Sequence, residues 1–175
     1  MRREIEADPR KLFERWYVQP LRELEKLPDG DGGFVVLATC CFLYERYARA
    51  YLRDSGEKAS DENVICQLSR DFGVPRDIAE VFWNVIRNGF LHQGMPKARD
   101  NRGRTSLPGW RTHHAFPRPI DLVSGKAPTE LQIQPWLFRD RVFELYQARP
   151  DLIAYDKNFL WGAIVKLVEE GGGSR

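Results

Sequence analysis

Two long segments of the sequence, residues 34–54 and 75–91, repeat apolar side chains at the spacing of an α-helix. The first segment carries this repeat at Leu37, Cys40, Cys41, Tyr44, Tyr47, Ala48 and Tyr51. The second carries it at Ile78, Val81, Phe82, Val85 and Ile86. Because an α-helix has 3.6 residues per turn, each set lies along one side of its helix. A helix with one apolar face must bury that face against another element, so the two segments predict a helical bundle.

Four further helices are predicted from the same periodicity and from helix-boundary residues. They cover residues 9–27, 60–70, 136–148 and 157–170. Pro20 lies inside the first of them and is expected to kink or split it near Val18. Ser60 or Asp61 is expected to cap the second, and Pro135 opens the third. With the two long segments, these helices indicate a mainly α fold.

The helical pattern is interrupted over residues 97–135. Segments 119–123 and 130–134 each alternate apolar and polar residues, and SGKAPT between them has turn composition, which predicts a β-hairpin. The residues before this hairpin lack periodicity and are expected to form a loop or partly ordered arm. At 175 residues, we expect one domain over 1–175, with 97–135 as a basic loop and hairpin insertion and 171–175 as a flexible tail.

Composition limits the classes of function. The net charge is +2, so any nucleic-acid site must be a local patch. The three cysteines do not form a disulfide framework, and no CxxC or HxxxH spacing predicts a zinc site. The charged N-terminus lacks a secretion signal, and the longest apolar run, residues 34–43, is too short to cross a membrane. We therefore expect a cytoplasmic protein with no bound metal.

The second long segment ends in a crowded polar stretch, RNGFLHQG (87–94). Bulky apolar neighbours predict that Arg87, Asn88 and His92 are at least half buried and need partners. A simpler alternative is that Arg87 and His92 are cations favoured by the dipole at a helix C-terminus. On an ideal helix their five-residue separation is about 140° in azimuth and about 7.5 Å along the axis. A joint site therefore requires that the helix unwinds after Gly89, or that two copies meet across a two-fold axis.

These residues carry a family resemblance. An arginine, a polar residue, three more residues and a histidine form the signature of the HEPN superfamily, which Arg87, Asn88 and His92 match. FWNVIRNGFLHQGMPK (82–97) resembles the motif-bearing helix of HEPN-like bacterial proteins. CCFLYERYARAYL (40–52) resembles the helix that packs against it, with Glu45 at its polar break. The resemblance covers roughly residues 30–97, and the C-terminal helices only by class.

The resemblance implies a HEPN-like up-and-down bundle of five or six helices with a small β-hairpin insertion. It also implies a homodimer formed through the helix that carries Arg87 and His92. Many members of the superfamily are metal-independent endoribonucleases in toxin–antitoxin, anti-phage and RNA-processing systems, whereas others are inactive binding modules. The expected partners are therefore RNA, or an antitoxin or nucleotidyltransferase, and no cofactor is expected.

The residue types suit such chemistry. Histidine is a common general acid and base, so His92 can take the proton of a 2′-hydroxyl or give one to the leaving oxygen. Arg87 is permanently charged and matches a phosphate, and Asn88 can orient the imidazole or the substrate. These three are the candidate catalytic residues. Glu45 is a weaker candidate, and its simpler role is as a partner for a neighbouring arginine, Arg46 or Arg49.

A basic arm follows the motif. Between residues 97 and 118 there are six basic residues and one acidic residue, with aromatic residues interleaved. Basic groups bind phosphates and aromatic rings stack on bases, so the arm is a candidate RNA-binding surface. Its candidate residues are Lys97, Arg99, Arg102, Arg104, Trp110 and Arg111. The alternative is a solvated loop whose charges serve solubility. A helical interaction protein with no chemical site is the corresponding alternative for the whole chain.

Overall fold

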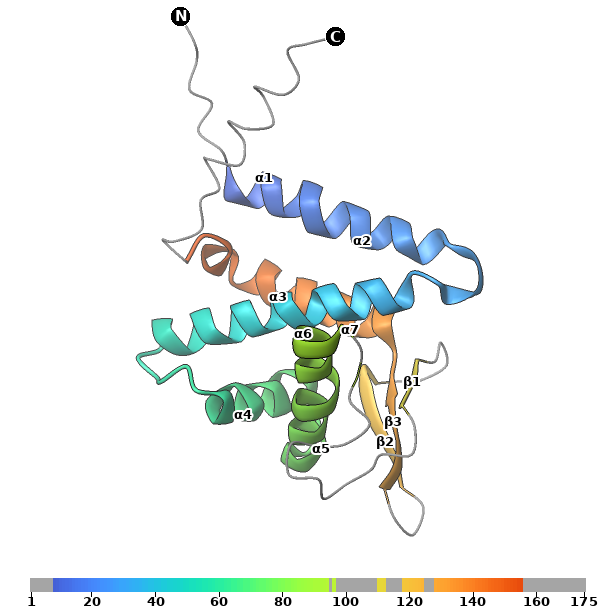
Figure 1. Ribbon diagram of the computed structural model, residues 1–175. Coiled ribbons are helices and arrows are strands. Elements are labelled where there is room, and N and C mark those ends of the chain that lie inside the picture. Colours follow the sequence, from blue (N-terminus) through green and yellow to red (C-terminus); the bar gives the residue numbers. More distant parts are fainter. Residues whose placement is uncertain (1–7, 95, 97–109, 113–117, 125–127, 156–175) are drawn as a thin grey trace, which may run out of the picture.

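The computed structural model describes residues 8–94, 96, 110–112, 118–124 and 128–155 and is mainly helical (Figure 1). The described helices are α1 (Pro9–Phe13), η1 (Glu14–Val18), α2 (Gln19–Glu23), η2 (Leu24–Lys26), η3 (Pro28–Gly30), α3 (Gly33–Asp54), α4 (Asp61–Phe72), α5 (Arg76–Val81), η4 (Phe82–Arg87), α6 (Asn88–Gln93), α7 (Pro135–Ala148) and η5 (Pro150–Ile153). The strands are β1 (Trp110–Thr112), β2 (Ile120–Ser124) and β3 (Pro128–Ile133). The predicted helical bundle is confirmed.

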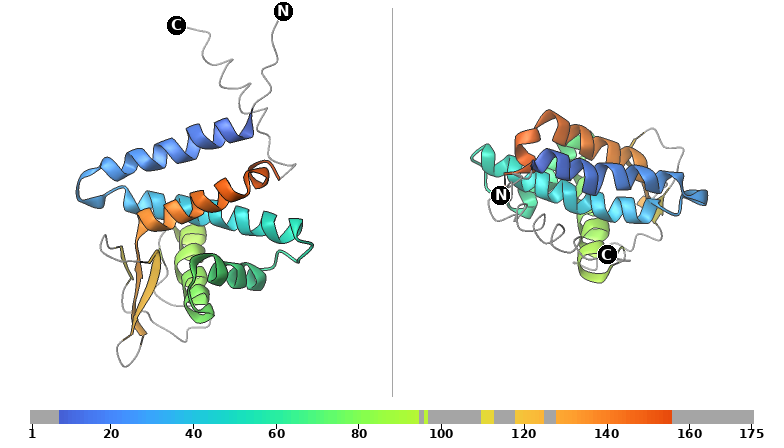
Figure 2. Two further views of the ribbon diagram at one scale, coloured as in Figure 1. Left: turned by 180° about the vertical axis from the view of Figure 1, so that it is seen from behind. Right: turned by 90° about the horizontal axis from the view of Figure 1, so that it is seen from above.

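The two longest helices, α3 and α7, pack against each other and form the centre of the bundle. The N-terminal helices α1 and α2 lie over this pair on one side, and α4 to α6 lie on the other (Figures 1 and 2). Aromatic side chains fill the space between them: the rings of Phe72 and Phe138 stack at 4.7 Å, and the buried Tyr146 hydroxyl donates to the Leu43 carbonyl at 2.9 Å. The apolar stripe predicted on residues 37–51 faces this core, as expected, because its members from Leu37 to Ala48 are buried and Tyr51 packs against the core.

Pro20 changes the N-terminal helix, as predicted. A proline removes one backbone N–H and its ring clashes with the carbonyl four residues earlier. Here the five residues before α2 form a π-helix, and the Gln19 N–H donates to the Glu14 carbonyl, five residues back. The wider turn lets the chain continue into α2 with Pro20 as its second residue.

The middle helices begin where the sequence suggested, but they end at Phe72 and Gln93, each two residues later than predicted. The Ser60 hydroxyl accepts from the Asn63 N–H at 3.3 Å and caps α4, which ends at the left-handed Gly73. The segment predicted as one helix over 75–91 starts after Pro75 and ends at the left-handed Gly94. It changes type along its length, from α5 through the π-helix η4 to α6. Each π turn adds a residue to the backbone ring and rotates the side chains that follow.

The predicted hairpin is confirmed, and a third strand extends it. β2 and β3 pair antiparallel, with Ile120 opposite Ile133, and both of these side chains are fully buried. β1 pairs with β3 in parallel. The expectation of a loop throughout residues 97–118 is therefore wrong at 110–112. A three-residue strand is too short to show periodicity and depends on pairing with a distant partner.

Some predictions fall on residues that the structure does not describe: the helix over 157–170, the tail over 171–175, and most of the basic arm. Across the described ranges, no helix is both long enough and apolar enough to cross a membrane.

Candidate functional site

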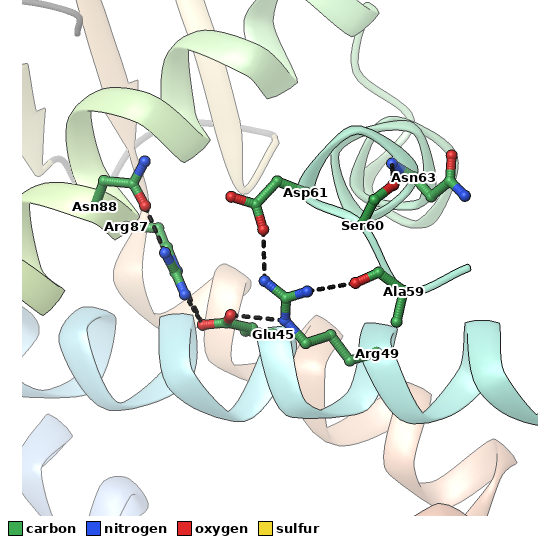
Figure 3. Close-up of polar contacts among 8 residues, drawn as sticks. All are labelled: Glu45, Arg49, Ala59, Ser60, Asp61, Asn63, Arg87 and Asn88. Carbon is green, nitrogen blue, oxygen red and sulfur yellow. Dashed lines mark hydrogen bonds and ion pairs between the residues drawn. The ribbon is translucent and has the colours of Figure 1, made fainter. Parts of the chain in front are cut away.

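Arg87 lies inside the protein, paired with Glu45 of α3. Its side chain is 8% exposed and that of Glu45 is 17% exposed. The Arg87 Nε donates to Glu45 Oε2 at 2.9 Å, and a terminal guanidinium nitrogen donates to the same oxygen (Figure 3). Two buried charges are tolerated when they are paired and hydrogen-bonded, because each compensates the lost hydration of the other. The pair therefore joins η4 to α3.

Glu45 serves a second arginine with its other oxygen. Arg49, one turn further along α3, donates from Nε to Glu45 Oε1 at 2.8 Å. The Arg49 guanidinium also reaches the Asp61 carboxylate and the Ala59 carbonyl, at the start of α4 (Figure 3). The predicted pairing of Glu45 with Arg49 is thus confirmed. The pairing with Arg87 was not predicted, and it makes Glu45 the centre of a network across α3, α4 and η4.

Asn88 and Trp83 complete the surroundings of Arg87. The remaining terminal nitrogen of the guanidinium donates to Asn88 Oδ1, and the Asn88 side chain is buried. The guanidinium carbon lies 4.6 Å from the centre of the Trp83 ring, a cation–π distance. The Trp83 indole nitrogen is buried and has no hydrogen-bond partner among the described residues. Carboxylate, amide and ring thus fix the guanidinium from three sides.

This geometry limits what Arg87 can do chemically. A guanidinium has five N–H donors, and three are used by Glu45 and Asn88. Two donors therefore remain for a phosphate oxygen. Because the side chain is only 8% exposed, little of it is open to a phosphate. The carboxylate of Glu45 also offsets part of the positive charge.

His92 lies apart from this network. It is in the last turn of α6 and is exposed, as is its neighbour Leu91 at 46%. The described residues offer its imidazole no hydrogen-bond or ion-pair partner. The expectation of at least half burial is therefore confirmed for Arg87 and Asn88 and is wrong for His92.

The backbone excludes one of the two arrangements that a joint Arg87–His92 site requires. The helix does not unwind after Gly89, because α6 continues to Gln93 and the chain first turns left-handed at Gly94, with φ of 68°. A glycine in a helix need not break it when the turn around it is packed, and Gly89 is buried. The second arrangement, two copies that meet across a dimer axis, stays a prediction.

The basic arm is described only in part. Lys97, Arg99, Arg102 and Arg104 lie outside the described residues. The backbone of Trp110 and Arg111 forms most of β1, on the edge of the small sheet. Their role in RNA binding stays a prediction.

Two features of the site were missed from the sequence. The first is the Glu45–Arg87 pair, for which the signal was a carboxylate inside an otherwise apolar and aromatic stretch of helix. The second is a pocket of about 270 Å³ where η5 meets α3, lined in part by Glu45, Arg46 and Arg49. Its signal was the recurrence of arginine along one face of residues 46–53.

The described part of the chain contains no group of three or more His, Cys, Asp or Glu side chains that could hold a metal ion.

Comparisons with protein-family models, with curated proteins and with solved structures found no match for this chain.

Proposed function

We propose that the chain is a HEPN-type, metal-independent endoribonuclease that acts as a homodimer, with Arg87, Asn88 and His92 as its catalytic residues. The observation that carries the proposal is the fixed guanidinium of Arg87, held by Glu45 and Asn88 and stacked on Trp83. A buried arginine that keeps two unused donors is oriented before any substrate arrives. Such preorganisation is how enzymes stabilise the charge that develops in a transition state.

The reaction assigns one role to each residue. An imidazole of His92 takes the proton of a 2′-hydroxyl, and the 2′-oxygen attacks the adjacent phosphorus. Arg87 stabilises the added negative charge on the phosphorane with its unused N–H donors. The 5′-oxygen of the next nucleotide leaves and takes a proton from a second imidazole, and a 2′,3′-cyclic phosphate remains.

Two histidines are needed, and a dimer provides them. His92 and Leu91 are both exposed at the end of α6, so a second copy that covers this apolar side chain also brings a second imidazole. A two-fold interface places the same residues on both sides of its axis. One copy then provides the base and the other the acid.

A second candidate function is a non-catalytic binding module for RNA, a nucleotide or a protein partner, such as an antitoxin or a nucleotidyltransferase. The neutralisation of Arg87 by Glu45 favours it, because a paired and largely buried guanidinium binds a phosphate less strongly than a free one. In this function the Arg87 network stabilises the bundle, and His92 is a surface residue.

Incubation of the purified protein with bulk RNA in EDTA distinguishes the two functions. The proposal predicts cleavage that His92→Ala abolishes and that Gln93→Ala, a change of the exposed neighbour, leaves intact. Equal cleavage by wild type and His92→Ala indicates a contaminating nuclease and refutes the proposal. Binding without cleavage, weakening steeply with salt, supports the second function. Size-exclusion chromatography with light scattering tests the dimer.

A further inference from the structure

The pocket at the junction of α3 and η5 has the lining of a nucleotide site. It lies along the outward face of the second half of α3, and its volume is about 270 Å³. Three arginines and two aromatic residues contribute to its wall: Phe42, Arg46, Arg49, Arg53 and Tyr155. Phe42 is 42% exposed, so part of its surface is open to a ligand.

The helix itself aligns these side chains. Residues 42, 46, 49 and 53 follow one another at intervals of four, three and four, so they lie along one face of α3. At 1.5 Å per residue, the row is roughly 16 Å long. Tyr155 faces the same pocket from the segment that follows η5. One wall is therefore a row of cations with an aromatic residue at its end, and a second aromatic residue also lines the pocket.

The pocket carries positive charge that its own lining does not neutralise. Glu45 is the one carboxylate among its lining residues, and both of its oxygens already accept from Arg49 and Arg87. Arg46 donates to the Ile153 carbonyl, and Arg49 also pairs with Asp61, which lies outside the lining. Arg53 is exposed and forms no ion pair within the described part of the chain. Surplus cations in a concave site attract an anion.

We propose that this pocket binds a nucleotide, with its phosphate on the arginines and its base against the ring of Phe42. Arginine matches a phosphate through paired N–H donors, and aromatic rings stack on bases of any sequence. The nucleotide belongs to a single-stranded RNA or is a free mononucleotide. The inference rests on the proposed function, because Glu45 joins the pocket to Arg87 and a bound RNA strand would thus lie beside the candidate catalytic residues.

Fluorescence anisotropy with a labelled, single-stranded 2′-O-methyl oligonucleotide tests the pocket without cleavage of the probe. Arg53→Ala and Phe42→Ala are the test variants, and Phe42→Leu retains an apolar side chain without the ring. Arg22→Ala is the matched control, because Arg22 is an exposed arginine on α2 that does not line the pocket. The four variants change three exposed positions, and circular dichroism checks that each variant is folded.

We expect each Phe42 variant to weaken binding by at least about fivefold, the loss of one base–aromatic stack. Arg53→Ala should lower the slope of log affinity against log salt by about 0.7, the loss of one phosphate contact on a single strand. Arg22→Ala should leave both quantities at the wild-type values. An equal loss in Arg22→Ala, or no loss in the Phe42 and Arg53 variants, overturns the inference.

Three competitors identify the source of the nucleotide. Displacement of the probe by a mononucleotide at similar concentration indicates a free nucleotide, and displacement by unlabelled oligonucleotide alone indicates an RNA strand. Displacement by inorganic phosphate, with no effect of Phe42→Ala, shows a simple anion site and overturns the nucleotide assignment. If the pocket variants weaken probe binding but wild type does not cleave RNA, the proposed function is refuted and the pocket assignment is retained. If wild type cleaves RNA but the pocket variants bind the probe as wild type does, only the pocket assignment is refuted.

Discussion

Replacement of Glu45 by glutamine tests the buried network most sharply. Glutamine has the same shape, and its amide oxygen still accepts one hydrogen bond, but the negative charge is removed. Arg87, whose side chain is 8% exposed, then keeps its charge without a carboxylate to compensate it. Breaking a buried ion pair by removing one partner costs about 3–5 kcal/mol in the free energy of unfolding.

The expected cost for Glu45→Gln is somewhat lower. Glu45 is 17% exposed, so water screens part of the interaction, and the remaining hydrogen bond offsets another part. We therefore expect a loss of roughly 2–4 kcal/mol. For a chain of this size, 1 kcal/mol corresponds to about 2–4 °C in melting temperature, so thermal unfolding followed by circular dichroism should fall by roughly 5–15 °C.

Glu62→Gln is the matched control. Glu62 also pairs with an arginine, Arg76, at 2.9 Å, but its side chain is 75% exposed and that of Arg76 is 58% exposed. Water already hydrates both charges, so this change should leave the melting temperature at the wild-type value. If Glu45→Gln lowers the melting temperature no more than Glu62→Gln does, the Glu45–Arg87 pair is not the buried tie described above.

Three further predictions concern other parts of the bundle. Burial raises the pKa of Asp71 above its ordinary value of 3.8. The protonated carboxyl therefore adds to the stability of the protein at low pH, and this contribution is lost as the pH rises through the folded-state pKa. The difference in melting temperature, Asp71→Asn minus wild type, should therefore rise as the pH increases from below 3.8 to neutral; a constant or falling difference contradicts this. Burial also raises the pKa of the Cys40 and Cys41 thiols, so a thiol reagent should label only the half-buried Cys66 in native buffer and all three cysteines in guanidinium. A Cβ at Gly32 would lie 2.2 Å from a backbone carbonyl oxygen of η2, so Gly32→Ala should lower the stability by roughly 1–3 kcal/mol, and an unchanged urea midpoint would contradict this close approach.

The helices were predictable because local signals specify them. The apolar spacing of residues 37–51 and the cap at Ser60 depend on neighbours in the sequence, and α3 and α4 formed where those signals lay. The strand β1 was not predictable, because its three residues are held by pairing with β3 and not by any preference of their own. The π-helix η4 was not predictable either, since nothing in its composition distinguishes it from an α-helix.

The candidate site was predictable in its residues but not in its connections. Arg87 and Asn88 were singled out by their crowded apolar neighbours, and both are buried. Glu45, the partner of Arg87, lies 42 positions away, and spacing along the chain carries no information on such a contact. The exposure of His92 follows from where α6 ends relative to the core, which depends on the packing of the whole bundle.

The most direct test of the proposed nuclease is the analysis of RNA ends after cleavage in EDTA. Wild-type protein should cut a 5′-labelled single-stranded RNA and leave a 2′,3′-cyclic phosphate. His92→Ala should cut it at least about 100-fold more slowly, the usual contribution of a general acid or base. The absence of cleavage by wild type, ends other than the cyclic phosphate, or an equal rate in His92→Ala would contradict the proposed function.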